Sequence, residues 1–183
     1  MKETDTLEKY IKKMKKPSDF FNHHICRSSL YGGIEYFVTL YSKIPERFLY
    51  EIYKEALMKS IRHKFKKQLF TEKLERKIKA LGKDEILSNT NLVNLADDDG
   101  FITVYRGHTD DIEYTSASWT ANEDFAHRFG KRHALFDNLP YYYVTKGRVN
   151  IDDIVMYITE KGEDEIIVLP KFVKEKTREI FEF

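Results

Sequence analysis

The chain has 183 residues, a formal net charge of +1 and one cysteine, which allows one ordinary domain, or a small domain with an appendage, and a real hydrophobic core. The lone Cys26 excludes an internal disulfide and a cysteine-based zinc site. The charged start MKETDTLEKY does not fit a signal peptide, and no run of about 18 apolar residues could span a membrane, so we expect a soluble cytoplasmic protein.

The small net charge hides an asymmetry between two halves of the chain. Residues 1–95 hold 20 Lys and Arg against 12 Asp and Glu, or +8, whereas residues 96–183 hold 11 against 18, or −7, and the two values sum to +1. The acidic run at 97–100, DDDG, is typical of a turn, and we place the boundary between two regions there. Only the first region attracts anions by its bulk charge.

Residues 1–95 have the pattern of a helical region. Apolar residues recur at helical spacing, as in the stretch 7–14, and predict four or five helices. We expect Ser18 to cap one helix, Pro45 to occupy the first turn of a long helix, and Gly82 to end the last one.

The segments IRHKFKKQLF and EKLERKIKAL in this region place Lys and Arg around amphipathic helices. Two interpretations stay open. The basic surface binds nucleic acid or an acidic protein partner, or it is a solvated helix face that docks on the acidic half of the chain, which its opposite charge also favours.

After Gly100 the pattern changes to short strands. Only one clear helix interrupts them, predicted over 121–129 with Thr120 as its N-cap, Glu123 completing a capping box, and Phe125, Ala126 and Phe129 on one face. The sequence therefore predicts an α+β protein with a compact, mostly antiparallel β unit in residues 96–183. The expected strands are 101–105, 114–119, 141–145, 154–158, 165–169 and 178–183.

Polar groups occur at three places in this β unit where strand packing does not require them. The first is VYRGHT, which puts Arg106 at the end of an apolar strand beside Gly107. The planar guanidinium donates two parallel hydrogen bonds and suits a phosphate, and glycine lets backbone or ligand approach closely. The alternative is a surface arginine that caps a strand.

The second place is YTSASWT, in which strand alternation puts Ser116 and Ser118 on one face. Two hydroxyls on one face can orient a ligand, although small residues on the wet face of a half-exposed strand give the same pattern.

The third place is GEDEIIVLP, where Glu163 and Glu165 share a face at the start of an apolar strand. In a cleft, two adjacent carboxylates raise the pKa of at least one of them unless a cation or donor compensates. A solvated turn before an edge strand is the alternative.

The order of these motifs resembles that of the mono-ADP-ribosyltransferases of the Arg-Ser-Glu class. The matching segments are YRG at 105–107, SASWT at 116–120, AHRF at 126–129 and EDEIIVLP at 163–170, with S-A-S in place of the commoner S-T-S. The resemblance implies a β-sandwich of the ADP-ribosyltransferase type in residues 96–183. It does not extend to residues 1–95, although in the family such helices commonly cover one wall of the NAD cleft.

The resemblance implies that the protein binds NAD as a substrate and passes its ADP-ribose to a protein acceptor. Arg106, next to Gly107, would hold the NAD phosphates, Ser116 would position the catalytic glutamate and the nicotinamide ribose, and Ser118 would brace the strand. Glu165 matches the catalytic position, where a carboxylate hydrogen-bonds the ribose 2′-hydroxyl and offsets the charge of an oxocarbenium-like transition state. These five residues would line the NAD site.

Glu163 implies an arginine acceptor, because in the family a glutamate there holds and helps to deprotonate a guanidinium. Residues 159–164 would form the acceptor-recognition loop, in which Gly162 allows movement. The implied setting is a small toxin or phage effector in the cytoplasm of the producing or infected cell. Hydrolysis of NAD, and a catalytically silent protein whose basic helices bind a partner, stay open as alternatives.

Other candidate residues have simpler explanations. His23, His24 and Cys26 lie close together but face different ways on a helix, so we expect no metal site. His108 is near enough to Arg106 in the sequence to line the NAD cleft. Tyr157 is expected to pack in the core, because strand aromatics mostly do so.

Overall fold

A computed structural model describes residues 2–60, 66–109, 117–159, 162 and 164–183. The chain divides into two compact units, residues 1–81 and 82–183, and helix α7 (Glu72–Ser88) contributes to both. In this division the end of α7 and helix α8 (Thr90–Val93) belong with the strands, whereas the sequence placed a boundary at 95–96. Within the described ranges, no helix is both long and apolar enough to cross a membrane.

The first unit is helical, and buried aromatic side chains join its helices. The rings of Phe20 and Phe37 meet edge-on with centroids 6.1 Å apart, and the ring of Tyr53 lies 6.3 Å from that of Phe37. The Tyr53 hydroxyl donates to the Leu69 carbonyl at 2.8 Å, which satisfies its polar end inside the core. The elements before α7 are α1 (Lys2–Ile11), α2 (Asp19–Asn22), α3 (His24–Ser28), α4 (Ile34–Leu40), η1 (Tyr41–Lys43), α5 (Glu46–Lys59) and α6 (Lys66–Leu69).

The expected helix ends before β1 are borne out only in part. Ser18 stands at the N-cap position of α2 but its side chain makes no capping hydrogen bond, and Pro45 directly precedes α5 instead of lying in its first turn. Gly82 does not end α7, which continues to Ser88. Glycine costs a helix about 1 kcal/mol relative to alanine. Burial of Ile86, in the next turn of α7, against the strands of the second unit outweighs that cost.

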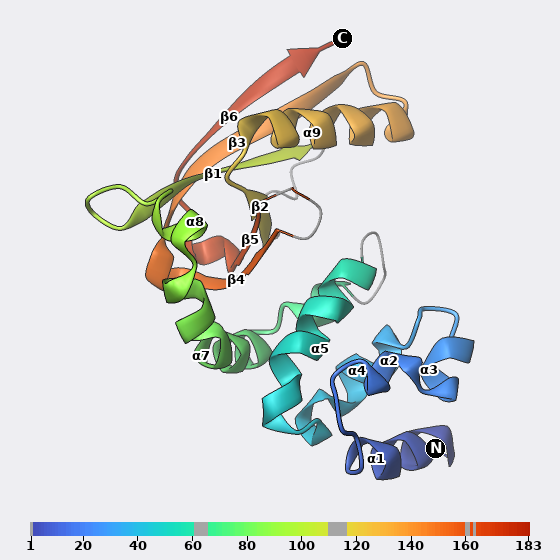
Figure 1. The fold of residues 1–183 in the computed structure, drawn as a ribbon. Helices are drawn as coiled ribbons and strands as arrows, with labels where there is room; N and C mark the ends of the chain where they lie inside the picture. Colours follow the sequence, from blue (N-terminus) through green and yellow to red (C-terminus); the bar gives the residue numbers. More distant parts are fainter. Residues whose placement is uncertain (1, 61–65, 110–116, 160–161, 163) are drawn as a thin grey trace. The chain divides into compact units, whose positions relative to one another are not determined.

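The second unit is built on one antiparallel sheet with the strand order β4-β5-β2-β1-β3-β6 (Figure 1). This confirms the predicted α+β class and the antiparallel pairing. The described strands form a single hydrogen-bonded sheet, which differs from the two facing sheets expected of a sandwich. The strands are β1 (Phe101–His108), β2 (Ser118–Thr120), β3 (Tyr141–Asn150), β4 (Ile154–Ile158), β5 (Glu165–Val168) and β6 (Lys174–Glu182), with short helices η3 (Ile151–Asp153) and η4 (Pro170–Phe172) between strands.

A hydrophobic cluster covers one face of the sheet. Trp119 of β2, which is 2% exposed, packs there with alternate apolar residues of the other strands, as expected when every second strand side chain points to one face. The ends of α7 and α8 complete this core. Its buried residues are Ile86, Leu92, Ile102, Val104, Trp119, Val149, Ile154, Tyr157, Ile166, Val168 and Val173.

Helix α9 (Glu123–Asp137) lies along β1 and β3 (Figure 1). It is longer than the predicted helix, and its N-cap is Asn122 instead of Thr120. The Asn122 side chain accepts from the Phe125 amide at 3.2 Å, while the Thr120 hydroxyl accepts from the Asn122 amide at 3.1 Å. Thr120 lies in β2 and therefore organises the approach to the helix, and Asn122 caps it.

Small residues form the buried face of α9. They are Ala126, Gly130 and Ala134, whereas Phe125 and Phe129, predicted to share the face of Ala126, are only half-buried. The reason is close packing, because a Cβ on Gly107 of β1 would stand 1.8 Å from the Ala126 carbonyl oxygen. The backbones meet so closely that only small side chains fit between them.

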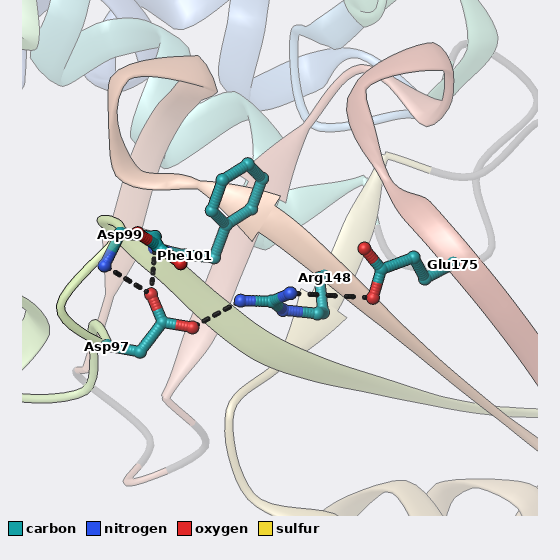
Figure 2. A network of polar contacts seen from close by, with 5 residues as sticks. All are labelled: Asp97, Asp99, Phe101, Arg148 and Glu175. Carbon is teal, nitrogen blue, oxygen red and sulfur yellow. Dashed lines mark hydrogen bonds and ion pairs between the residues drawn. The ribbon is translucent and has the colours of Figure 1, made fainter.

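A network of polar contacts closes the turn before β1, the acidic run identified in the sequence. The Asp97 carboxylate accepts from the amides of Asp99 at 3.1 Å and Phe101 at 2.9 Å, and it also accepts from Arg148 of β3 (Figure 2). Arg148 reaches Glu175 of β6 at 3.5 Å. The amide of Phe101, then the guanidinium of Arg148, hold the pKa of Asp97 below its ordinary value.

The close contact between α9 and β1 predicts that Gly107→Ala destabilises the second unit. The added Cβ meets backbone atoms that cannot rotate away, so we expect a loss of about 2 to 3 kcal/mol, at the upper end of overpacking costs. Urea unfolding followed by the fluorescence of Trp119, the single tryptophan, measures it. The exposed Glu179→Ala in β6 is the control, expected to stay within about 0.5 kcal/mol. Equal stability of both variants would contradict the packing described.

The network around Asp97 predicts an acid-dependent part of the stability. A carboxyl whose pKa is lowered by folding contributes stability above its ordinary pKa of 3.8, and the contribution is lost as the pH falls through the lower folded value. Asp97→Asn should therefore have a lower free energy of unfolding than wild type at pH 7. The difference in free energy between the two proteins should disappear as the pH falls below 3.8. Urea midpoints measured from pH 7 down to acid test this, and a gap that is constant with pH would refute it.

Candidate functional site

Three strands bring together residues that are far apart in the sequence. Arg106 lies near the end of β1, Ser118 begins β2 and Glu165 begins β5. Because β2 pairs with both other strands, Thr120 stands opposite Tyr105 on one side and opposite Glu165 on the other. One residue from each of the three predicted motifs, Arg106, Ser118 and Glu165, therefore lies on three adjacent strands of the sheet.

Ser118 contacts both of the charged residues. The Arg106 Nη1 donates to the Ser118 carbonyl oxygen at 2.6 Å, and the Ser118 hydroxyl donates to Glu165 Oε1. All three residues are half-buried, where hydrogen bonds to charged groups are strong and fix their orientation. Ser118 therefore holds the Arg106 guanidinium through its carbonyl and the Glu165 carboxylate through its hydroxyl.

Ser118 makes a contact that the sequence did not predict. The resemblance implied that Ser116 positions Glu165 and that Ser118 braces the strand; the Ser118 hydroxyl also donates to Glu165, and the role of Ser116 stays a prediction. Ser116 and Glu163 lie outside the described residues. The Ser118–Glu165 contact follows from the pairing of β2 with β5. In that pairing Ser118 stands opposite Ile167, which lies two residues after Glu165 and so on the same face of the sheet, and no local pattern predicts this register.

The turn before β5 is held by two further hydrogen bonds. The Tyr157 hydroxyl donates to Asp164 Oδ1 at 2.6 Å, and the Ala121 amide donates to the Asp164 carbonyl at 3.2 Å. Tyr157 packs in the core as predicted, at 6% exposed, but its hydroxyl contact was missed. Burial, and then the bond to Asp164, raise the pKa of Tyr157, so its hydroxyl stays a donor at neutral pH.

A second acidic side chain lies beside β1 at the start of α9. Glu123 faces Tyr105, and burial of the phenol, then the charge of Glu123 and a hydrogen bond to it, raise the pKa of Tyr105. The sequence assigned Glu123 to a capping box. Its position beside the residue that precedes Arg106 follows from the packing of α9 on β1, which no local pattern encodes.

Gly107 and His108, which follow Arg106 in β1, both make packing contacts within the fold. The close approach at Gly107, which the sequence left open to backbone or a ligand, is made by the backbone of α9. His108 is buried, and its Nε2 lies 2.9 Å from the Thr145 hydroxyl while its ring stacks on Tyr143. His108 therefore packs between β1 and β3.

Among the side chains that the structure describes, no three of His, Cys, Asp or Glu converge as metal ligands. His23 accepts from the Ile25 amide at 3.3 Å through Nδ1 and lies with its ring centroid 4.3 Å from that of Tyr10. Burial, then the charge of Glu35, raise the pKa of Cys26 to about 12. These contacts account for the histidine and the cysteine as parts of the helical core.

The bond from Arg106 to β2 predicts a structural cost for Arg106→Ala. Loss of a charged, half-buried hydrogen bond to the Ser118 carbonyl should lower the stability of the second unit by about 1.5 to 3 kcal/mol. The control is Arg132→Ala on α9, whose exposed guanidinium lies over Phe129 at 4.5 Å and is worth at most about 1 kcal/mol. Urea unfolding reported by Trp119 compares them, and a loss no larger than that of the control would contradict the described contact.

A comparison of the chain with protein-family models, with curated proteins and with solved structures finds no match.

Proposed function

We propose that the protein is an NAD-dependent mono-ADP-ribosyltransferase that moves ADP-ribose from NAD to a protein acceptor and releases nicotinamide. The observation that carries the proposal is the chain of contacts from Arg106 through Ser118 to Glu165. Arg106 and Glu165, which are far apart in the chain, both contact one residue of the S-x-S motif. The proposal includes an antiparallel sheet of the ADP-ribosyltransferase type.

In this proposal Glu165 stabilises the transition state. The bond between ribose C1′ and the nicotinamide nitrogen breaks, and its electron pair leaves with nicotinamide, which becomes neutral. Positive charge then develops on the ribose, and the Glu165 carboxylate, oriented by Ser118, offsets it while accepting a hydrogen bond from the 2′-hydroxyl. The acceptor nucleophile bonds to C1′ and gives up its proton. No acid is needed for the leaving group.

Arg106 binds the NAD phosphates in this proposal. Residues 96–183 carry 11 basic against 18 acidic residues, so their bulk charge does not attract an anionic substrate. A guanidinium fixed by its bond to the Ser118 carbonyl gives a local positive site next to the residue that orients Glu165. The phosphates and the reacting ribose are then held by two residues that both contact Ser118.

The acceptor that we propose is an arginine side chain. This rests on the sequence, because Glu163 precedes Glu165 by two residues and a carboxylate there can hold a guanidinium and take up its proton. In the described part of loop 159–164, Gly162 has a φ of 64° and its amide donates to the Thr159 carbonyl at 2.8 Å. This tight turn suits a loop that contacts an acceptor protein. We place the activity in the cytoplasm of the producing or infected cell.

The proposal predicts that Glu165→Gln abolishes the reaction with little effect on folding. Loss of one transition-state charge contact should lower nicotinamide release by about 100-fold or more. The purified protein is incubated with labelled NAD and a bacterial lysate, and both labelled protein and free nicotinamide are measured. Glu179→Gln, an exposed carboxylate on β6, is the matched control and should keep wild-type rates.

The same assay separates the alternatives. Label on a discrete lysate protein, lost in Glu165→Gln, supports transfer, and loss of labelling with retained nicotinamide release in Glu163→Gln supports an arginine acceptor. Nicotinamide release without labelled protein indicates NAD hydrolysis. Absence of both turnover and NAD binding would refute the enzyme and direct the search to nucleic acid or acidic partners of the basic region, residues 1–95.

A further inference from the structure

The residue before Glu165 has an unusual backbone conformation. Asp164 has a φ of 45°, in the left-handed region that non-glycine residues adopt rarely, although aspartate and asparagine tolerate it better than most. Such a conformation persists where the surroundings hold it, and outliers of this kind cluster at functional sites.

Both ends of Asp164 are held. Its carboxylate accepts from Tyr157 of β4 at 2.6 Å, and its carbonyl accepts from the amide of Ala121, between β2 and α9, at 3.2 Å. Tyr157 is itself fixed in the hydrophobic cluster that contains Trp119 and Ile166. The turn is therefore attached to the rigid core on one side and to the segment that follows β2 on the other.

The backbone conformation of Asp164 determines where the next residue, Glu165, places its carboxylate. Glu165 is the first residue of β5, where it stands opposite both Thr120 and Ile158, and its side chain meets Ser118. A change of φ at Asp164 would rotate the chain as it enters β5 and move the Glu165 carboxylate. Displacements of about 1 Å at a reacting group can cost 100-fold in rate.

We infer that Tyr157 and Asp164 are positioning residues, whose hydrogen bond fixes the left-handed turn and thereby sets Glu165 against its substrate. This inference rests on the proposed function for the role of Glu165. The bond itself is a property of the fold and is testable without it. Neither residue needs to touch NAD.

Substitutions separate the hydrogen bond from the backbone conformation. Tyr157→Phe removes only the donor. Asp164→Asn keeps an acceptor oxygen and tolerance of positive φ, so it should stay within about twofold of wild type. Asp164→Gly adopts positive φ freely but has no acceptor, so it should behave like Tyr157→Phe. The matched control is Tyr36→Phe, because the Tyr36 hydroxyl donates to Glu3 at the same distance, 2.6 Å, in the first unit.

Nicotinamide release is measured under conditions in which Trp119 fluorescence shows that every variant is folded. Tyr157→Phe and Asp164→Gly should each lower kcat by about tenfold, with KM for NAD changed less than about twofold, because the carboxylate is displaced and phosphate binding is not. The double variant should fall no further than either single one, since the two residues form a single contact. Wild-type kcat in Tyr157→Phe, or additive losses in the double variant, would overturn the inference.

Amide exchange of Ala121 tests the turn independently of turnover. Its amide donates to the Asp164 carbonyl, so exchange should be faster by about tenfold in Tyr157→Phe and unchanged in Tyr36→Phe. If wild type does not turn over NAD, the proposed function fails, and this measurement alone decides whether the bond orders the turn. Unchanged exchange in Tyr157→Phe would show that it does not.

Discussion

The arrangement at the site depends on the short strand β2, and above all on its first residue. Ser118 uses its carbonyl for Arg106 and its hydroxyl for Glu165, and the preceding carbonyl, that of Ala117, accepts from the Val168 amide at 2.8 Å. A strand of three residues has few ladder hydrogen bonds of its own. The side-chain bonds of Arg106 and Glu165 therefore stabilise β2 while β2 orients them, so the site and the middle of the sheet stabilise each other.

Close packing of α9 against β1 fixes the position of this helix beside the site. Gly107 and Gly130 allow the helix to approach, because a Cβ on either would meet Ala126 backbone or the Tyr142 ring at 1.8 and 2.3 Å. The approach sets the helix start beside Tyr105 and Thr120. Dense contact of this kind transmits small displacements between the helix and the strands on which it packs.

Much of the fold could be predicted from local patterns. Short strand-like runs predicted the positions of the strands, although most of the run 114–119 lies outside the described residues, and helical spacing identified the helical region. Predictions of single helix ends were less accurate. Thr120 and Asn122 can both cap a helix by local chemistry, and pairing of Thr120 in β2 decides between them. Gly82 is a reasonable stop signal that burial of Ile86 overrides.

The sequence by itself determined the α+β class and the antiparallel pairing, because residue type and period are local properties. It also supplied the candidate site residues, which are Arg106, Gly107, Ser116, Ser118, Glu163 and Glu165. Only the tertiary structure decided that Ser118 donates to Glu165, that Gly107 serves helix packing, and that Tyr157 holds Asp164. These depend on strand register and on the approach of elements distant in the chain. A shift of one residue would exchange the two faces of a strand, and no local pattern encodes a register between strands more than 40 residues apart.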